Sequence, residues 1–81
     1  MIKRYLIAQY FPGMGQTEEN PACYFGTGTY VLPADLPKYI KERYCYKTRA
    51  AAEKYAIKCN IAYMYSRFAV KEIILTGTEE K

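Results

Sequence analysis

The most reactive side chains of this sequence are three cysteines, and the chain contains no histidine to stand beside them. Cys23, Cys45 and Cys59 form no C-x-x-C pair, and three separated thiolates are too few for a cysteine-only zinc site. Histidine is the commonest general base and zinc ligand, so triad and zincin chemistries lack their usual base. The sequence therefore predicts a protein that is not an enzyme and that holds no metal or cofactor.

An odd number of cysteines is a poor disulfide framework, which predicts reduced thiols. We expect Cys45, on a strand, and Cys59, on a helix, to be small buried hydrophobic side chains. Cys23 is expected to be the more exposed thiol.

The glycine-containing segments match no nucleotide-binding loop. Gly13-Met14-Gly15 lacks the third glycine and the following helix of a dinucleotide fingerprint. The segment from Gly26 to Val31 matches part of a kinase glycine-rich loop, but no catalytic loop or D-F-G follows it. The eight carboxylates show no spacing that would pair two of them as acid and base. A turn is the simpler interpretation of Gly13-Met14-Gly15.

Positive charge is concentrated in residues 38–58, where seven basic side chains stand against two acidic ones, a local balance of +5. Such a segment could contact phosphates, as single-strand binders do, or the acidic surface of a protein. It could also be a solvated face in which Arg49 and Glu53 pair at i and i+4. The candidate residues for a nucleic acid or an acidic surface are Lys38, Lys41, Arg43, Lys47, Arg49, Lys54 and Lys58.

Ten tyrosines are too many for an 81-residue core to bury with every hydroxyl hydrogen-bonded, so several must reach the surface. Exposed tyrosine favours recognition, because a rigid ring supplies contact area at low entropic cost. Tyr39, Tyr44 and Tyr46 lie within or next to the basic segment and are candidate partner contacts.

The elements that must position these residues fit one domain, residues 1–81, with globular proportions of hydrophobic (51%) and charged (25%) residues. Strands are expected over 2–11, 24–32, 42–47 and 68–76, with an exposed loop over 12–22 and a flexible tail over 77–81. Pro33 and Pro37 allow only a short helical turn, through about Lys41. No apolar run approaches the length of about 20 residues that spans a bilayer, so we expect a cytoplasmic domain without membrane contact.

The principal helix is expected to begin at Arg49 behind a Thr48 cap, and to end near Asn60 or near Met64. Its core face would carry Ala52, Tyr55, Ala56, Cys59 and Tyr63. A second apolar stripe, formed by Ile57, Ile61 and Met64, lies roughly opposite. If the helix continues beyond Asn60, this stripe is a candidate contact for a partner or for a second copy of the chain; if it ends there, Ile61 and Met64 belong to a turn or strand.

The segment from Tyr44 to Ala56, a strand running directly into an alanine-rich helix, resembles segments of small accessory proteins of phages and mobile elements. That class includes anti-CRISPR proteins, which inhibit host defence complexes by occupying a site on a larger assembly. The resemblance implies the same kind of role and carries over no individual residue.

Together these patterns predict an α+β domain with a mainly antiparallel sheet of three or four strands and one principal helix packed on one face. The expected function is non-enzymatic binding to a larger protein or ribonucleoprotein assembly, as a phage-encoded inhibitor of a defence complex such as CRISPR-Cas. The alternative is direct nucleic-acid binding through residues 38–58.

Overall fold

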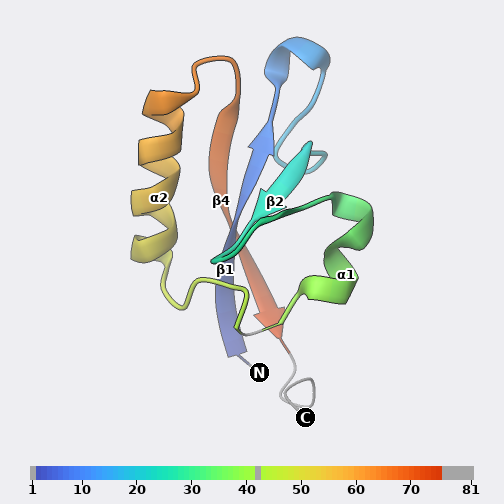
Figure 1. Cartoon of the computed structure of the whole chain (residues 1–81), viewed down its shortest axis with the longest axis vertical. Coiled ribbons are helices and arrows are strands. Elements are labelled where there is room, and N and C mark those ends of the chain that lie inside the picture. Colours follow the sequence, from blue (N-terminus) through green and yellow to red (C-terminus); the bar gives the residue numbers. More distant parts are fainter. Residues whose placement is uncertain (1, 42, 76–81) are drawn as a thin grey trace.

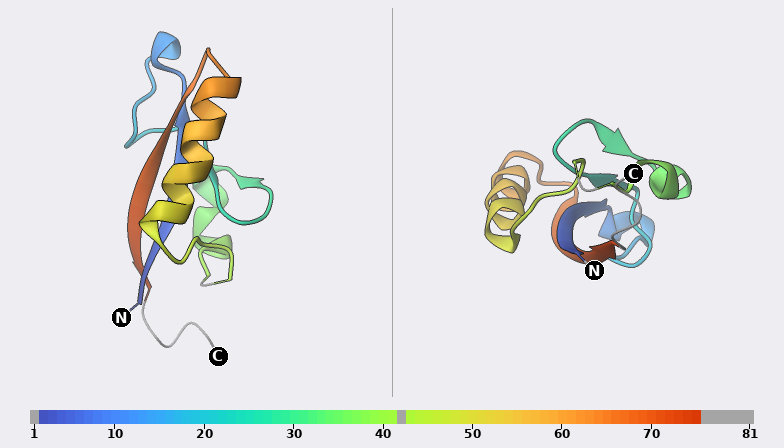
Figure 2. Two further views of the ribbon diagram at one scale, coloured as in Figure 1. Left: turned by 90° about the vertical axis from the view of Figure 1, so that its left-hand side faces the viewer. Right: turned by 90° about the horizontal axis from the view of Figure 1, so that it is seen from below.

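A computed structural model of the chain describes residues 2–41 and 43–75 (Figure 1). Two nine-residue strands, β1 (Ile2–Tyr10) and β4 (Arg67–Leu75), pair along their whole length, and β2 (Cys23–Phe25) and β3 (Tyr30–Val31) extend the sheet from the other side of β1. The strand order is β3-β2-β1-β4, and every pair is antiparallel. The long helix α2 (Arg49–Ala62) packs on β4 and β1, whereas the short helix α1 (Leu36–Tyr39) lies on the opposite side of the molecule (Figures 1 and 2). The predicted small α+β domain is confirmed.

The core between α2 and the sheet follows from the small side chains of one helix face. Ala52, Ala56 and Cys59 are buried against Ile7 of β1 and Phe68 of β4. Small residues at these positions let the helix approach the sheet closely, and each large apolar side chain buried beneath it contributes about 1.5–3 kcal/mol. The predicted core face of the helix is therefore correct at its centre.

The opposite face of the sheet is also buried at its middle. Antiparallel partners share a face, so Leu6, Ala8 and Tyr24 point away from α2, and all three are at most 6% exposed. Cys45 is buried as well, although it lies in a turn rather than on the expected strand. Within the described chain, no helix is long and apolar enough to cross a membrane.

The expected strand over 24–32 is wrong in its middle, because residues 26–29 form the turn between β2 and β3. This turn bonds to the segment before α2 instead of to a neighbouring strand. The Thr27 amide donates to the Tyr44 carbonyl at 2.7 Å, and the Tyr44 hydroxyl donates to the Thr29 carbonyl at 2.5 Å. The ring of Tyr44 fills the space beside Gly26 that a β-carbon would occupy.

The expected strand over 42–47 is reduced to one β-bridge, in which Tyr46 exchanges two backbone hydrogen bonds with Tyr5 of β1. β2 pairs with residues 7–9 of β1, so the segment before α2 meets that edge of β1 before residue 7. The expectation that Cys23 is exposed is also wrong. Cys23 is only 7% exposed, because its strand β2 lies between β1 and β3 in the sheet.

The ends of α2 follow local rules. Thr48 caps the first turn, its hydroxyl accepting a hydrogen bond from the Ala51 amide at 3.2 Å. The helix ends at Ala62, between the two expected ends, so Ile61 lies within it and Met64 in the turn that follows. Most of the expected loop over 12–22 is exposed and includes a 3-10 turn, Pro12–Met14, whereas the expected tail over 77–81 lies outside the described residues.

Candidate partner-binding surface

The outward face of α2 and the turn after it expose four large apolar side chains, which we call the α2 apolar surface. Ile57 is 60% exposed, Ile61 76%, Met64 85% and Tyr65 92%. The helical period places Ile57 and Ile61 opposite the buried Ala52 and Cys59, so α2 cannot bury both faces against its own sheet. Single exposed hydrophobic residues are common, but four at one end of a helix form a surface suited to a partner.

Two lysines lie among these apolar side chains. Lys54 and Lys58 are exposed on the same helix. Lys54 lies about one turn before Ile57, and Lys58 lies next to Ile57 and about one turn before Ile61. Neither forms an ion pair with any described residue. The surface therefore combines apolar anchors with uncompensated positive charge.

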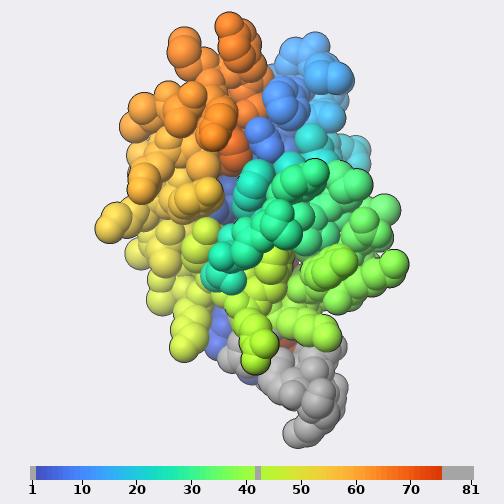
Figure 3. All heavy atoms as spheres, in the orientation of Figure 1, coloured from blue at the N-terminus to red at the C-terminus, as the bar shows by residue number. Residues whose placement is uncertain are grey.

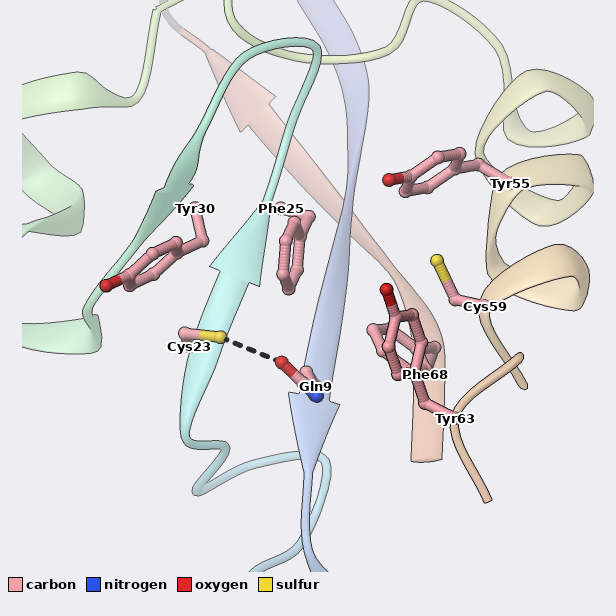
Figure 4. Close-up of a pocket in the computed structure, with 8 residues that line it drawn as sticks. All are labelled: Gln9, Cys23, Phe25, Tyr30, Tyr55, Cys59, Tyr63 and Phe68. Carbon is pink, nitrogen blue, oxygen red and sulfur yellow. Dashed lines mark hydrogen bonds between the residues drawn. The ribbon is translucent and has the colours of Figure 1, made fainter. Parts of the chain in front are cut away.

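An aromatic groove lies between α2 and the β2–β3 hairpin, and Figure 4 shows side chains from both sides of it. In the space-filling view, α2 and the hairpin region share one face of the molecule (Figure 3). The groove has a volume of about 350 Å³. Its lining consists of aromatic rings, two thiols and one amide, from Gln9, Cys23, Phe25, Tyr30, Tyr55, Cys59, Tyr63 and Phe68.

A second hollow continues the groove toward the α2 apolar surface. Gln9 and Tyr63 line both hollows, and Met64 and Tyr65 line only the second one, which has a volume of about 370 Å³. Ser66 is buried at its floor and accepts a hydrogen bond from the Gln9 amide at 3.0 Å. The two hollows therefore adjoin at Gln9 and Tyr63, and the second one is bordered by Met64 and Tyr65 of the α2 apolar surface, whereas Ile57 and Ile61 lie on the outward face of the helix.

Two titratable groups of the groove, Cys23 and Tyr55, favour their neutral forms. The Cys23 thiol donates a hydrogen bond to Gln9 Oε1 at 3.2 Å, and burial raises the pKa of this thiol. The neighbouring Cys59 thiol is the main cause that raises the pKa of Tyr55. A thiol and a phenol held in their neutral forms can donate hydrogen bonds but are poor nucleophiles.

The basic residues are distributed over three elements instead of one surface. Lys38 is on α1, and Lys54 and Lys58 are on α2, on the other side of the molecule (Figure 1). Lys41, Arg43 and Lys47 occupy the segment between the two helices.

Arg49, one of the candidate basic residues, is already engaged in contacts within the chain. It contacts Glu53 at 3.9 Å and Glu72 at 3.3 Å, and its guanidinium lies 5.3 Å from the ring centroid of Tyr5. The expected pairing of Arg49 with Glu53 is present, and these contacts hold the start of α2 against the sheet.

The three candidate tyrosines do not join the α2 apolar surface. Tyr39 is 52% exposed on α1, Tyr44 is fixed against the β2–β3 turn, and Tyr46 packs beside the core under α2.

The residues that sequence reasoning missed are Tyr65 and the groove rings of Phe25, Tyr55, Tyr63 and Phe68. Tyr55 and Tyr63 were expected in the core, but they lie at the edge of that face and are 40% and 60% exposed.

Comparison of the chain with protein-family models, curated proteins and solved structures found no match, so the assignment of this surface depends on its geometry and chemistry.

Proposed function

We propose that the chain is a non-enzymatic binding module that docks on a larger protein or ribonucleoprotein assembly through the α2 apolar surface and the aromatic groove. The observation that supports this most directly is the exposure of Ile57 and Ile61 on α2 and of Met64 and Tyr65 in the turn after it. Central apolar and aromatic anchors inside a polar rim are the usual anatomy of a protein interface.

The partner that fits this surface is a protein segment with apolar side chains flanked by carboxylates. Its apolar side chains would enter the aromatic groove, and its carboxylates would meet Lys54 and Lys58, which have no ion partners among the described residues. Complementary charge at the rim would guide association and select the partner. Nucleic acid fits this face less well, because Ile57 and Ile61 offer nothing to phosphates.

The kind of assembly is suggested by the resemblance to small phage and mobile-element proteins. An inhibitor of a defence complex such as CRISPR-Cas would act by occupying a site on that complex, and the surface described above would be the part that occupies it. CRISPR-Cas complexes are therefore the first assemblies to test.

The test measures binding of the purified chain to immobilised CRISPR-Cas complexes, and to their subunits separately, by interferometry. Ile61→Glu should weaken binding about 30-fold, the effect of losing an anchor worth about 2 kcal/mol. Because Ile61 is 76% exposed, the melting temperature should not change. Met14→Glu is the matched control, since Met14 is 75% exposed on the 3-10 turn at Pro12–Met14 and should leave binding unchanged.

Equal affinities of the parent and Ile61→Glu would contradict the proposed surface. Failure to bind any such complex would discard the CRISPR-Cas assignment. If the chain instead binds a single-stranded oligonucleotide and Lys41→Gln, Arg43→Gln and Lys47→Gln abolish that binding, the nucleic-acid alternative replaces the proposal.

A further inference from the structure

The outer edge of β4 is a second region of the molecule with unpaired binding groups. β4 is the last strand of the sheet and pairs only with β1, through nine consecutive residue pairs without a bulge. The edge contains no proline or glycine from Arg67 to Leu75. Such an edge is a template for another strand unless something covers or interrupts it.

The residues that face this edge can be identified from the hydrogen bonds of β1. The amide and carbonyl of Tyr5 both bond to Tyr46, on the side of β1 away from β4. Tyr5 therefore forms a non-hydrogen-bonded pair with Glu72, and the alternation of antiparallel ladders turns the backbone groups of Val70, Glu72 and Ile74 outward.

Phe68 confirms the alternation and marks one end of the open edge. Its amide donates to Asn60 Oδ1 at 2.9 Å, and its carbonyl accepts from Asn60 Nδ2 at 3.0 Å, so a side chain of α2 takes the place of a neighbouring strand. Beyond Phe68, no backbone group of the described residues pairs with the outward groups of Val70, Glu72 and Ile74.

Among the twofold pairings that join at least two of the outward residues Val70, Glu72 and Ile74, only one avoids opposing like charges. These antiparallel registers place Lys71, Glu72 or Ile73 opposite its own copy. The first two bring together two ammonium groups or two carboxylates, which destabilises a strand pair. With Ile73 on the axis, Glu72 pairs with Ile74 of the second copy, and Ile74 pairs with its Glu72.

The position of α2 favours the same register. Arg49, at the start of the helix, contacts Glu72, and Asn60, near its end, contacts Phe68, so α2 runs beside residues 68–72 of β4. A twofold axis at Ile73 therefore places the two helices toward opposite ends of the joined strands.

We propose that the β4 edge binds a second copy of this chain, forming an antiparallel β4–β4 pair with Ile73 opposite Ile73. A second copy is the favoured occupant because its edge is already an ordered strand, whereas a disordered segment would lose conformational entropy on binding. The joined sheet would have eight strands, twice the four of one chain. This surface is separate from the α2 apolar surface, so both can be occupied together.

Proline at Ile74 provides a selective test. The Ile74 amide faces outward, so its loss leaves the ladder with β1 intact, and proline is tolerated on edge strands at such positions. The parent should change from monomer to dimer between about 1 and 200 µM in sedimentation velocity, a range typical of small interfaces. Ile74→Pro should remain monomeric and folded. Ile74→Thr, which keeps the amide, should still dimerise.

Amide exchange of the parent chain, measured residue by residue by NMR, tests the proposal without any substitution. The amides of Glu72 and Ile74 should exchange at least about tenfold more slowly at 200 µM than at 5 µM, because pairing protects them. The amides of Lys71 and Ile73, which bond to β1, should be protected at both concentrations. A parent chain that is monomeric at 200 µM, or a dimer broken by Ile61→Glu but not by Ile74→Pro, would overturn the proposal.

Discussion

Tyr44 joins the β2–β3 turn to the segment before α2, two parts of the chain that do not pair as strands. Its carbonyl accepts from the Thr27 amide, its hydroxyl donates to the Thr29 carbonyl, and its ring lies beside Gly26 and Gly28. A β-carbon on Gly26 would overlap the Tyr44 carbonyl oxygen. Gly26 therefore leaves room for this ring, and the tyrosine holds the β2–β3 turn against the segment before α2.

Sequence patterns carried part of this information. A glycine at position 26 indicates a place where another group can approach the backbone closely, and a neighbouring ring does so. The pattern could not identify Tyr44 as that ring, because a contact between residues so far apart in the chain depends on the tertiary path. Tyrosine is equally suited to an interface and to a half-buried contact, so composition alone could not separate the two roles.

The buried thiol of Cys45 should make stability depend on pH above neutrality. Burial raises the pKa of Cys45 from 9.0 to about 11. Because the folded chain holds this proton more tightly than the unfolded chain, its contribution to stability is complete below pH 9 and is lost as the pH rises toward 11. The full loss corresponds to about 3 kcal/mol.

This prediction can be checked by urea unfolding at pH 8 and pH 10.5, comparing the parent with Cys45→Ala. The parent and Cys45→Ala share every other ionisable group, so the difference between the two changes in unfolding free energy isolates the thiol. The parent should lose more stability over this interval than Cys45→Ala. Equal losses would mean that the thiolate is not excluded from its site.

At the scale of elements, Asn60 connects the end of α2 to the edge of β4. Replacing it with alanine removes two hydrogen bonds to the Phe68 backbone but adds a better helix former. We expect a net loss of about 1–2 kcal/mol in unfolding free energy and faster exchange of the Phe68 amide. Lys58→Ala is the control, because Lys58 is exposed on the same helix and makes no ion pair with a described residue. Unchanged exchange at Phe68 would show that the amide contact contributes nothing.

The elements that local rules describe are also the ones that the sequence predicted well. β1, α2 and β4 have strong periodicity or a recognisable cap, and their positions agree with expectation to within a few residues. The segment over 42–47 alternates like a strand, yet the described part of it forms one bridge, to Tyr5, on an edge of β1 whose residues 7–9 pair with β2. Strand formation depends on an available partner, which alternation does not report.

At the scale of the whole molecule, the strand order determines where the open β4 edge and the aromatic groove lie. The chain places β4 at an edge and α2 beside it, which creates both the open backbone groups and the groove between helix and hairpin. Neither feature is encoded within one element. The second apolar stripe of α2 was recognisable from the sequence, whereas the groove beside it required the approach of residues from β1, β2, α2 and β4.

The overall distribution of charge gives a prediction that separates protein from nucleic-acid binding. The net charge is +4, but Lys38, the segment over 41–47 and the lysines of α2 lie on different elements. Binding through the α2 apolar surface involves only Lys54 and Lys58, so partner affinity should fall by no more than about tenfold between 50 and 200 mM salt, since exposed rim charges are largely screened.

The triple variant Lys41→Gln, Arg43→Gln and Lys47→Gln should then bind the protein partner with the affinity of the parent, whereas Lys54→Gln with Lys58→Gln should weaken it and flatten the salt dependence. Contact with several phosphates would act differently, because each contact releases a counterion and the losses multiply to about a thousandfold over the same salt range. Isothermal titration at three salt concentrations distinguishes the two cases. A steep slope that the triple variant removes would place the binding surface on the segment between the helices, and the α2 apolar surface would then have no part in it.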